Sequence, residues 1–402
     1  MKILHTADWH LGQNFFDQNR LEEQACFLDF LFNYIQSERI DLLIVTGDIF
    51  DTANPPRSAE ELYYNFTARL HSLDHCQTLI IGGNHDSASH LDAPRKLLAH
   101  FNIHVVGALP KNLNDVLFHF EAHNQSVCIA AVPYLRDRDV RLAVEGEPFD
   151  AIEARTKAGV VKTYQDIAAL ALADRRPKEI LIATGHLTAV GGNLSSSERS
   201  IHIGNLGSIS ADQFNTAFDY IALGHLHEPQ SVGNTSHIRY SGSPIPLSFS
   251  ESRAKEIRLL TITDNHQLEQ QSIPLPTFRR LCRFSGSLQD ILHSIEALSI
   301  APDELHPWIE ATLTQGDSSL VINDQIREAA AEKGAEVLKV GTQLTRDQSN
   351  ALNPETALPI TEWNPIDVFQ KRLDSYQGDI PPETLTSCFN HVLNTVHEEE
   401  ES

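Results

Sequence analysis

Short apolar runs alternate with amphipathic stretches through the first two-thirds of the chain. Six runs predict strands: 2–7, 42–46, 78–81, 127–132, 180–184 and 220–223. Several of them are continuously apolar, as expected for strands buried on both faces of a sheet. Apolar residues recur with helical spacing in 21–37, 57–73 and 162–174. Because strands and helices alternate, the pattern predicts an α/β layered core.

The pattern changes around Pro274 and Pro276, where a small α+β unit begins. It predicts strands at 278–284, 308–314 and 335–344, with helices at 287–299 and 323–333. A polar stretch containing Pro354 and Pro359 follows and is typical of a linker. We therefore predict four parts: a core domain (1–276), an α+β capping domain (277–345), a linker (346–364) and a helical tail (365–402).

The tail contains two apolar stripes with helical spacing, separated by Pro381 and Pro382. The stripes consist of Ile366, Phe369, Leu373 and Tyr376, and then of Leu385, Phe389, Val392 and Val396. Two short helices cannot bury both stripes against each other. They must pack on the parent domain or on a helix of a partner, and the stripes alone do not decide between these.

Composition and charge limit the function. The chain has 402 residues, enough for about two or three domains. Its 41% hydrophobic content excludes wholesale disorder. With 31 basic and 54 acidic side chains, the net charge is −23, which argues against binding nucleic acid through charge alone. Nucleic acid remains possible as a substrate, because bound metal or a basic partner can reverse the local field.

The cysteines predict reduced thiols and a cytoplasmic location. Five cysteines, widely spaced and without a CxxC pair, do not suit a disulfide framework or a zinc knuckle. Residues 1–10 include Asp8 and lack a long apolar stretch, so we expect no signal peptide. No run is long enough and apolar enough to span a membrane.

Residues that bind metals follow five of the predicted strands. In order along the chain these residues are Asp8 and His10, Asp48, Asn84 with His85 and Asp86, His186, and His225 with His227. The carboxyl ends of strands in an open α/β sheet line one crevice, so side chains far apart in sequence converge there. Glycines precede Asp48, Asn84, His186 and His225 and permit tight turns and close backbone approach.

The residue types suit two divalent cations. Asp8, Asp48 and Asn84 offer oxygen, four histidines offer nitrogen, and no cysteine is present to select a soft metal. Seven ligands fill two sites about 3.5–4 Å apart if one carboxylate bridges them, and Asp48 is the best bridge. Such a pair activates water and neutralises charge during phosphoryl transfer. We then expect His85 to donate to the leaving oxygen or to a non-bridging oxygen, with Asp86 holding its ring.

Each motif taken alone has a plain structural interpretation. A single DxH or GNHD segment can be a capped turn, and a GHxH segment can be a pair of surface histidines. All of them follow apolar strands in order, which independent structural roles would not produce, so the combination favours a metal centre. We interpret the remaining histidines as structural or solvated.

With these residues in hand, the chain resembles the calcineurin-like metallophosphoesterases, whose signature is D-x-H, GD, GNH[DE], GH and GHxH. Within them it is similar to the SbcD family of bacterial nuclease subunits, counterparts of the Mre-type repair nucleases. The specific marks are 5–12, 47–51 with Pro55 and Pro56, 82–86, and 240–244. The resemblance covers essentially the whole chain, and every metal-site position matches.

The resemblance implies a four-layer metallophosphoesterase sandwich with a small α+β cap and a C-terminal helical hairpin. It assigns Asp8, His10, Asp48 and His227 to the first ion, usually manganese. It assigns Asp48, Asn84, His186 and His225 to the second ion and places His85 at the scissile phosphate.

The activity that the resemblance implies is ATP-stimulated exonuclease action on double-stranded DNA and endonuclease action on hairpins or blocked ends, in DNA repair, replication and recombination. The partner would be an SbcC-type ABC ATPase with a long coiled coil, which would bind the apolar tail. This chain lacks a GxxxxGK[ST] loop of its own. The resemblance also suggests a homodimer through 57–73 and 92–100.

Other interpretations remain open. The chain could be another calcineurin-like phosphoesterase acting on phosphoproteins or a small phosphodiester, although Thr52 and Asp86 stand where phosphoprotein phosphatases usually carry Arg and Glu. It could also be a non-catalytic scaffold for DNA ends, which would have no use for His85. Arg136, Arg138 and Arg141, or Arg279, Arg280 and Arg283, are candidates for local DNA contacts but equally suit a solvated face.

Overall fold

The computed structural model describes most of the chain: residues 1–141, 148–189, 208–251, 254–302, 304–314 and 320–342, and in the tail 369, 373, 381, 384–389 and 392. Within these residues no helix has the length and apolar character needed to cross a membrane. All five cysteines are free, as the sequence predicts. Three of the tail positions predicted to bind a partner lie outside the described residues: Ile366, Tyr376 and Val396.

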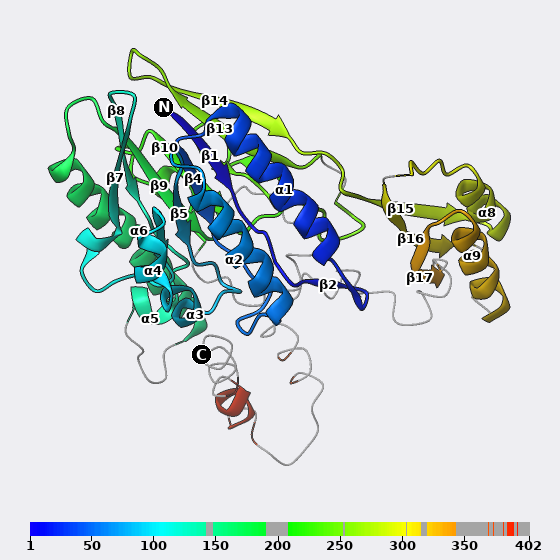
Figure 1. Ribbon diagram of the computed structural model, residues 1–402. Helices are drawn as coiled ribbons and strands as arrows, with labels where there is room; N and C mark the ends of the chain where they lie inside the picture. The colour runs from blue at the N-terminus through cyan, green and yellow to red at the C-terminus, as the bar shows by residue number, and fades with distance from the viewer. Residues whose placement is uncertain are drawn as a thin grey trace.

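Two six-stranded sheets form the core domain (Figure 1). The first has the order β14 (Leu268–Pro274), β13 (Glu256–Ile262), β1 (Lys2–Thr6), β4 (Leu42–Thr46), β5 (Gln77–Ile81), β6 (Ile103–Val106). The second has the order β11 (Gln230–Ser231), β12 (Ile238–Tyr240), β10 (Tyr220–Gly224), β9 (Ile180–His186), β8 (Gln125–Ala130), β7 (Leu117–Ala122). The central pairings, β1 with β4 and β9 with β10, are parallel.

The sheets pack face to face and helices cover both outer faces. Between the sheets, Ile44 and Leu79 of the first meet Ile129 and Ile182 of the second in one buried cluster. The continuous apolar runs of the sequence arise here, because each central strand is buried on both faces. Helices α1 (Leu21–Glu38) and α2 (Arg57–His71) pack on the first sheet, and α6 (Phe149–Asp174) packs on the second. The predicted four-layer sandwich is confirmed.

Shorter elements complete this core. They are the hairpin β2 (Asn14–Phe15) and β3 (Gln18–Asn19), and the helices α3 (Ala88–Asp92), α4 (Arg95–Ala99) and α5 (Asp137–Val140). The prediction placed the start of the third helix at residue 162, and this is wrong by about three turns, since α6 begins at Phe149. Its first turns pack on α5 rather than on a sheet, so they lack the broad apolar stripe that marks a sheet-packed helix.

The cap is a three-stranded parallel sheet with two helices, and its elements follow the predicted order. They are β15 (Arg279–Gly286), α8 (Leu288–Glu296), β16 (Leu305–Leu313), α9 (Leu320–Glu332) and β17 (Glu336–Thr342). Ile291, Ile309 and Ile326 lie in a separate buried cluster of the cap.

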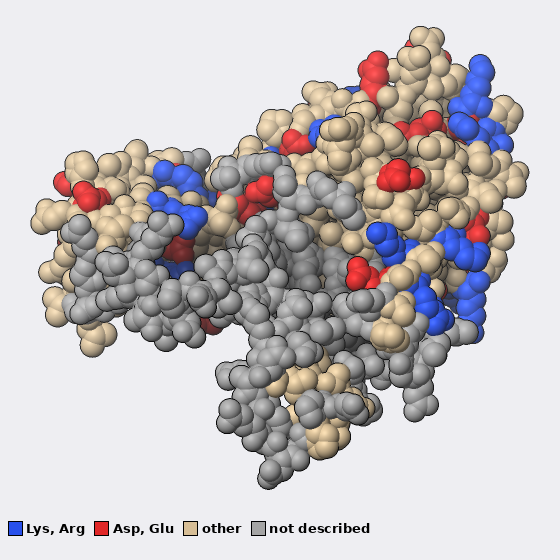
Figure 2. Space-filling view, turned by 180° about the vertical axis from the view of Figure 1, so that it is seen from behind, with Lys and Arg blue, Asp and Glu red and all other residues tan. Residues whose placement is uncertain are grey.

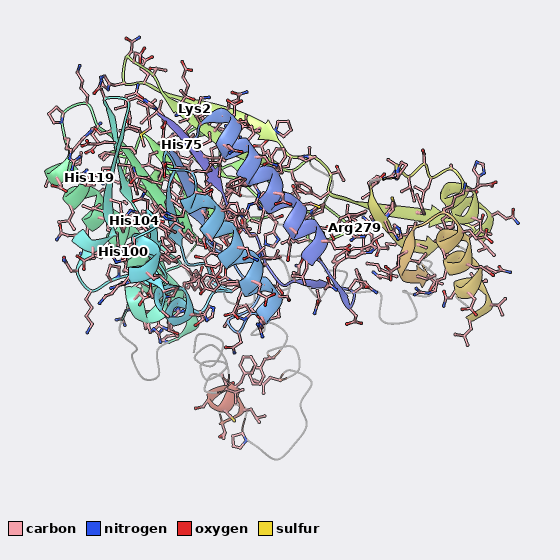
Figure 3. The ribbon with its side chains drawn as sticks, viewed as in Figure 1. Lys2, His75, His100, His104, His119 and Arg279 are labelled. Atoms are coloured by element: carbon pink, nitrogen blue, oxygen red, sulfur yellow. The ribbon has the colours of Figure 1, made fainter. Side chains whose placement is uncertain are left out.

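The cap meets the core at the start of β15, where Figure 3 labels Arg279. This guanidinium is almost fully buried and donates to Glu22 and Glu23 of α1, at 2.9 and 3.1 Å. It also stacks on Trp308 of β16, whose ring lies against Phe15 of the small hairpin. Arg279 is therefore committed to the joint between core and cap.

Candidate metal centre

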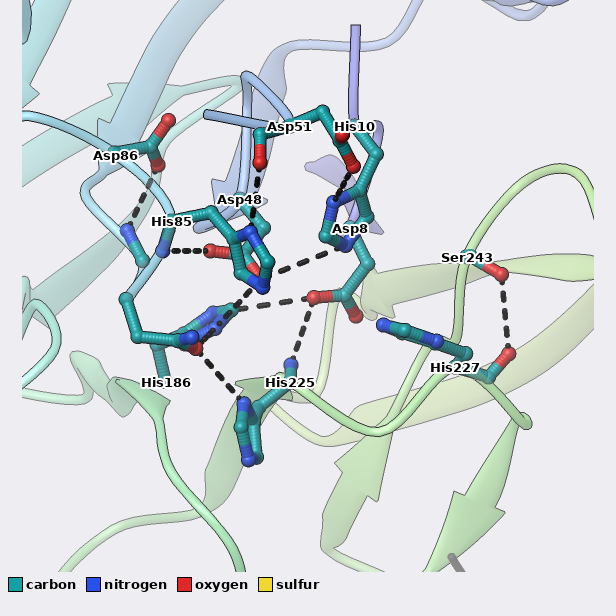
Figure 4. Close-up of polar contacts among 12 residues, drawn as sticks. Asp8, His10, Asp48, Asp51, His85, Asp86, His186, His225, His227 and Ser243 are labelled. Atoms are coloured by element: carbon teal, nitrogen blue, oxygen red, sulfur yellow. Dashed lines mark hydrogen bonds and ion pairs between the residues drawn. The ribbon is translucent and has the colours of Figure 1, made fainter. Parts of the chain in front are cut away.

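The predicted ligands gather at one edge of the two sheets (Figure 4). Asp8 and His10 follow β1, Asp48 follows β4, and Asn84 follows β5, all in the first sheet. The second sheet contributes three histidines: His186 ends β9, and His225 and His227 follow β10. Since the carboxyl ends of these strands point the same way, the site lies where the two sheets meet.

The backbone around the site is crowded and strained. A Cβ atom at Gly83 would lie 2.1 Å from Oδ1 of Asp48, so only glycine permits this approach. Four of the ligand residues have positive φ angles: 53° at Asp8, 45° at His10, 49° at Asp48 and 98° at His225. Such angles cost free energy in residues with a side chain, and they concentrate at functional sites.

One group of ligand atoms comes from Asp8, His10 and His227, which are all buried and offer atoms within 4.8 Å of one another. The rings of His10 and His227 lie edge to face with centroids 5.1 Å apart. Oδ2 of Asp48 lies 3.5 Å from Nε2 of His10 and so borders this group. The family resemblance implies these four residues as one set, and the structure brings them together.

A second group comes from Asp48, His186 and His225. Oδ2 of Asp48 lies 3.2 Å from Nε2 of His186, so this carboxylate borders both groups. Oδ1 of Asn84 lies 2.9 Å from Nε2 of His186 and 2.9 Å from Nδ1 of His225. Asp48 therefore has the position that a bridging carboxylate requires.

The donor set fits cations. The Nδ1 atom of His186 lies 2.9 Å from the carbonyl oxygen of Thr46, which can only accept, so Nδ1 carries the proton. In a neutral ring Nε2 then offers only a lone pair, which faces the oxygens of Asp48 and Asn84. Lone pairs that converge in this way repel unless a positive charge lies among them. Two further buried atoms, Oδ2 of Asp8 and Nε2 of His10, have no hydrogen-bond partner.

The pKa values of three of these residues indicate the same concentration of hydrogen-bond acceptors at the site. Burial opposes a charge on His10, but the hydrogen bond that its ring donates to Asp51 and the nearby carboxylates outweigh it and raise the pKa of His10 to about 9. Burial likewise opposes charge on His186, and Asp48 raises the pKa of that ring to about 9. Burial raises the pKa of Asp8 to about 7. Without a cation the site therefore collects protons, and divalent ions would replace them.

His85 lies beside the cage, but Asp86 does not hold its ring as predicted. Nδ1 of His85 lies 2.7 Å from the backbone carbonyl of Asp51 and donates to it. The carboxylate of Asp51 lies 3.1 Å from Nδ1 of His10, so this one residue orients both rings. The sequence interpretation included Asp51 in the GDIFD segment but gave it no role.

Asp86 instead ties two loops together. Its carboxylate accepts the backbone N–H groups of Gly83, Ile49 and Phe50 at 2.9, 3.1 and 3.0 Å. Ile49 follows the ligand Asp48, and Gly83 precedes the ligand Asn84. Asp86 therefore fixes the distance between the loops that carry them, and the predicted contact with the His85 ring is wrong.

Two further residues that the sequence interpretation missed hold the backbone of ligands. Nζ of Lys255, the residue before β13, donates to the carbonyl of His227 and to Oγ of Ser243, both at 2.9 Å. Nε2 of Gln24 in α1 donates to the carbonyl of His10 at 2.7 Å. Ser243 belongs to the segment 240–244 that marked the resemblance, which was the one available signal.

Comparison with known families follows the same division of the chain. Residues 1–229 match the family model described as Calcineurin-like phosphoesterase, and residues 277–377 match one described as Type 5 capsule protein repressor C-terminal domain. The first model covers more than half of the chain and includes all seven ligand positions. The chain therefore belongs to the calcineurin-like phosphoesterases.

Similar proteins identify a group within the calcineurin-like phosphoesterases. The SbcD component of the SbcCD nuclease of Escherichia coli K12 is 33% identical over 406 residues, 100% of both chains. The protein of the same name from Bacillus subtilis 168 is 28% identical over 404 residues, again 100% of both. That from Rhodobacter capsulatus is 35% identical over 318 residues, 75% of this chain and 77% of the relative. Within its class the chain thus belongs with the SbcD proteins, as its motifs predicted.

Among solved structures, a dimetal phosphatase from Danio rerio aligns with 68% of this chain and 99% of its own, with a TM-score of 0.38 and 15% sequence identity.

Proposed function

We propose that this chain is the nuclease subunit of an SbcC–SbcD-type complex and hydrolyses phosphodiester bonds in DNA with two divalent ions, which we take to be Mn²⁺. The observation that carries the proposal is the convergence of two ligand groups on Asp48 beside His85, in a chain related over its full length to nuclease subunits. We expect double-strand exonuclease and hairpin endonuclease activity, stimulated when the partner hydrolyses ATP.

We assign the ligands as the resemblance implies. Asp8, His10, Asp48 and His227 hold one ion, and Asp48, Asn84, His186 and His225 hold the other. When bound, the pair supplies an activated water and positive charge around the phosphate. The convergence of the unpartnered buried atoms of Asp8 and His10 supports this assignment.

We assign His85 to the leaving oxygen. Its Nδ1 proton is engaged by the carbonyl of Asp51, which fixes the ring and leaves Nε2 as the atom that can act on substrate. The ring is half-buried and lies 4.9 Å from that of His10, centroid to centroid, so it borders the cage without being enclosed in it. A proton delivered from Nε2 would neutralise the departing oxygen.

DNA affinity is expected to come largely from the partner. The net charge is −23, and on the face in Figure 2 the described Lys and Arg side chains lie in separate groups with acidic side chains between them. Arg279 is buried in the core–cap joint, while Arg280 pairs with Glu304 and Arg283 pairs with Glu310. These three arginines are therefore poor candidates for DNA contacts.

We propose that the tail binds the coiled-coil ATPase. Phe369 and Phe389 stack with ring centroids 4.1 Å apart, so the two stripes meet at these rings, while the side chain of Val392 is 52% exposed. We retain the proposed parts 1–276, 277–345, 346–364 and 365–402, and a cytoplasmic location. A homodimer through α2 and α4 is supported by the exposed apolar side chains of Tyr64 and Leu97 on them.

A substrate comparison tests the activity. The purified chain with Mn²⁺ is given linear duplex DNA, hairpin DNA, a phosphopeptide and a cyclic nucleotide. We expect cleavage of the two DNA substrates. Preferential turnover of the phosphopeptide or cyclic nucleotide would identify another phosphoesterase, and failure to cut DNA even beside the ATPase partner would favour the scaffold.

A substitution tests the role of His85. His85→Gln should retain Mn²⁺ and DNA binding but lose about 10²–10⁴-fold in cleavage rate, the usual contribution of a general acid. His123→Gln is the matched control, because that side chain is 71% exposed and belongs to a different surface. Unchanged cleavage by His85→Gln would remove it from the mechanism.

A deletion tests the role of the tail. Removing 365–402 should abolish co-purification with the ATPase partner and leave the unfolding temperature of the core unchanged. Retained association would place the partner surface elsewhere, and a loss of core stability would mean that the tail packs on its own chain.

A further inference from the structure

A second cluster of metal-binding residues lies away from the phosphoesterase centre, on the second sheet. His119 of β7 is the direct cross-strand partner of Cys128 of β8, and Glu179 immediately precedes β9. Strand β9 runs from Ile180 to His186, so the cluster lies at the opposite end of this strand from the ligand His186. Seven residues of strand separate the two sites by about 20 Å. Figure 3 labels His119 in this region.

The three side chains offer a nitrogen, a sulfur and an oxygen that all lie within 4.8 Å of one another. Nδ1 of His119 is 2.9 Å from Oε1 of Glu179. Cys128 is 1% exposed and Glu179 is wholly buried, while the side chain of His119 is 15% exposed. The cluster is thus closed on the protein side and reachable from solvent along the histidine.

The atoms of these residues that face away from the cluster are held in place. Nε2 of His119 lies 2.9 Å from Oδ2 of Asp174, at the end of α6. Oε2 of Glu179 accepts the backbone N–H of Arg176 at 3.0 Å. A carboxylate on the far nitrogen of a histidine is the usual support of a metal-binding imidazole, because it fixes the ring and the tautomer.

We propose that His119, Cys128 and Glu179 form a Zn²⁺ site, with solvent as the fourth ligand. Thiolate, imidazole and carboxylate are the ligands of four-coordinate zinc, and the sulfur distinguishes this site from the oxygen and nitrogen centre described above. Zinc replaces the thiol proton of Cys128 and, when His119 is an imidazolium, the proton on its Nδ1, and these protons pass to solvent. The ion joins β7, β8 and the start of β9 at the margin of the second sheet.

A proton is the competing occupant. An imidazolium of His119 between Glu179 and Asp174 satisfies both carboxylates, and Cys128 is then only an apolar neighbour. The two states can be distinguished by measurement, because only in the metal-bound state is the sulfur of Cys128 bonded to an ion.

Substitution with Co²⁺ distinguishes the metal-bound state from the protonated state. The full-length chain, freed of metal by chelation and exchanged into Co²⁺, should show a thiolate-to-cobalt charge-transfer band in the near ultraviolet. The phosphoesterase centre cannot produce this band because it contains no cysteine. We expect the band in the wild type and in Asp48→Asn, and its loss in Cys128→Ser and in His119→Gln. The latter keeps the thiol and tests whether the imidazole is a ligand.

Cys76→Ser is the control for a buried thiol elsewhere and should keep the band. Zinc added in excess over all three proposed ion sites should abolish it, and circular dichroism verifies that each variant is folded. No band in the folded wild type, or a band that survives in Cys128→Ser, would overturn the zinc site and leave the imidazolium pair. Neither result would affect the proposed nuclease, which is assayed separately.

Discussion

Substitution of Asp86 separates its observed role from the predicted one. The carboxylate accepts three backbone N–H groups at 2.9 to 3.1 Å and is almost fully buried. A hydrogen bond to a charged acceptor contributes about 1.5–3 kcal/mol. Burial raises the pKa of Asp86, and this cost of burying its charge offsets part of the sum. We therefore expect Asp86→Ala to lower the free energy of unfolding by about 3–5 kcal/mol, and Asp86→Asn by about half as much.

The same change should weaken the metal centre. Asp86 holds the loops of Asp48 and Asn84 together, so its loss lets these two ligands separate. Mn²⁺ affinity, measured by calorimetry, should fall about 10–100-fold, the usual effect of losing a group that orients ligands. Chemical denaturation of the metal-free chain measures stability independently.

Asp51→Asn is the matched control. It removes a carboxylate that is 26% exposed and contacts His10, and it leaves the backbone carbonyl that holds His85. It should weaken Mn²⁺ binding with little change in stability. If Asp86→Asn kept full stability and metal affinity but shifted the pH profile of cleavage, Asp86 would act on His85 as first predicted and the loop-tying role would be refuted.

Three further predictions concern residues around the core. Burial lowers the pKa of His5 to about 3, so the folded state keeps it neutral while the unfolded chain binds a proton below pH 6.5. Stability should fall by about 2 kcal/mol between pH 7 and pH 5 through this residue, and denaturation of His5→Gln should lack this component; equal pH dependence in both proteins would contradict the neutral ring. Lys255→Met removes the ammonium that pairs with the buried carboxylate of Glu251 and should lower the free energy of unfolding by about 3–5 kcal/mol. Adding Glu251→Leu should recover stability but not Mn²⁺ affinity if Lys255 positions His227, and recovery of both would show a purely structural role. Removing metal should lower the free energy of unfolding by about 2.7 kcal/mol for each of the two ions, relative to Mn²⁺ at 100 times its dissociation constant, and an unchanged unfolding temperature would argue against ions at the metal centre.

The sequence predicts that the candidate ligands converge, and they do, because each lies at the end of a strand that could be recognised from its apolar residues. Asp8, Asp48 and His186 could be placed at one edge from strand ends alone, without knowing the packing of the sheets. The contacts that orient them could not be predicted, because they depend on how distant segments meet. Lys255 reaches His227 from another sheet, and the contact between Asp51 and His85 runs through a backbone carbonyl that carries no sequence signal.

Apolar patterns in the sequence also fail to predict strands and helices that do not pack between a sheet and another layer. Strand β14 is largely exposed along one edge of the first sheet and has no continuous apolar run, and neither it nor β13 was predicted. The early turns of α6 pack on α5, which hides the periodicity on which the prediction depended. The role of Asp86 was misassigned because adjacency in sequence suggested a contact with His85 that the turn prevents.

The division of ligands between the sheets has a mechanical consequence. His186 and His225 of one sheet meet Asp48 and Asp8 of the other, so neither half of the sandwich contains a complete ligand group. If ions bind there as proposed, they would link the two sheets, and a shift of one sheet relative to the other would separate the ligands. Substitutions that weaken packing between the two sheets, even far from the ligands, should therefore abolish activity under conditions in which the chain is still folded.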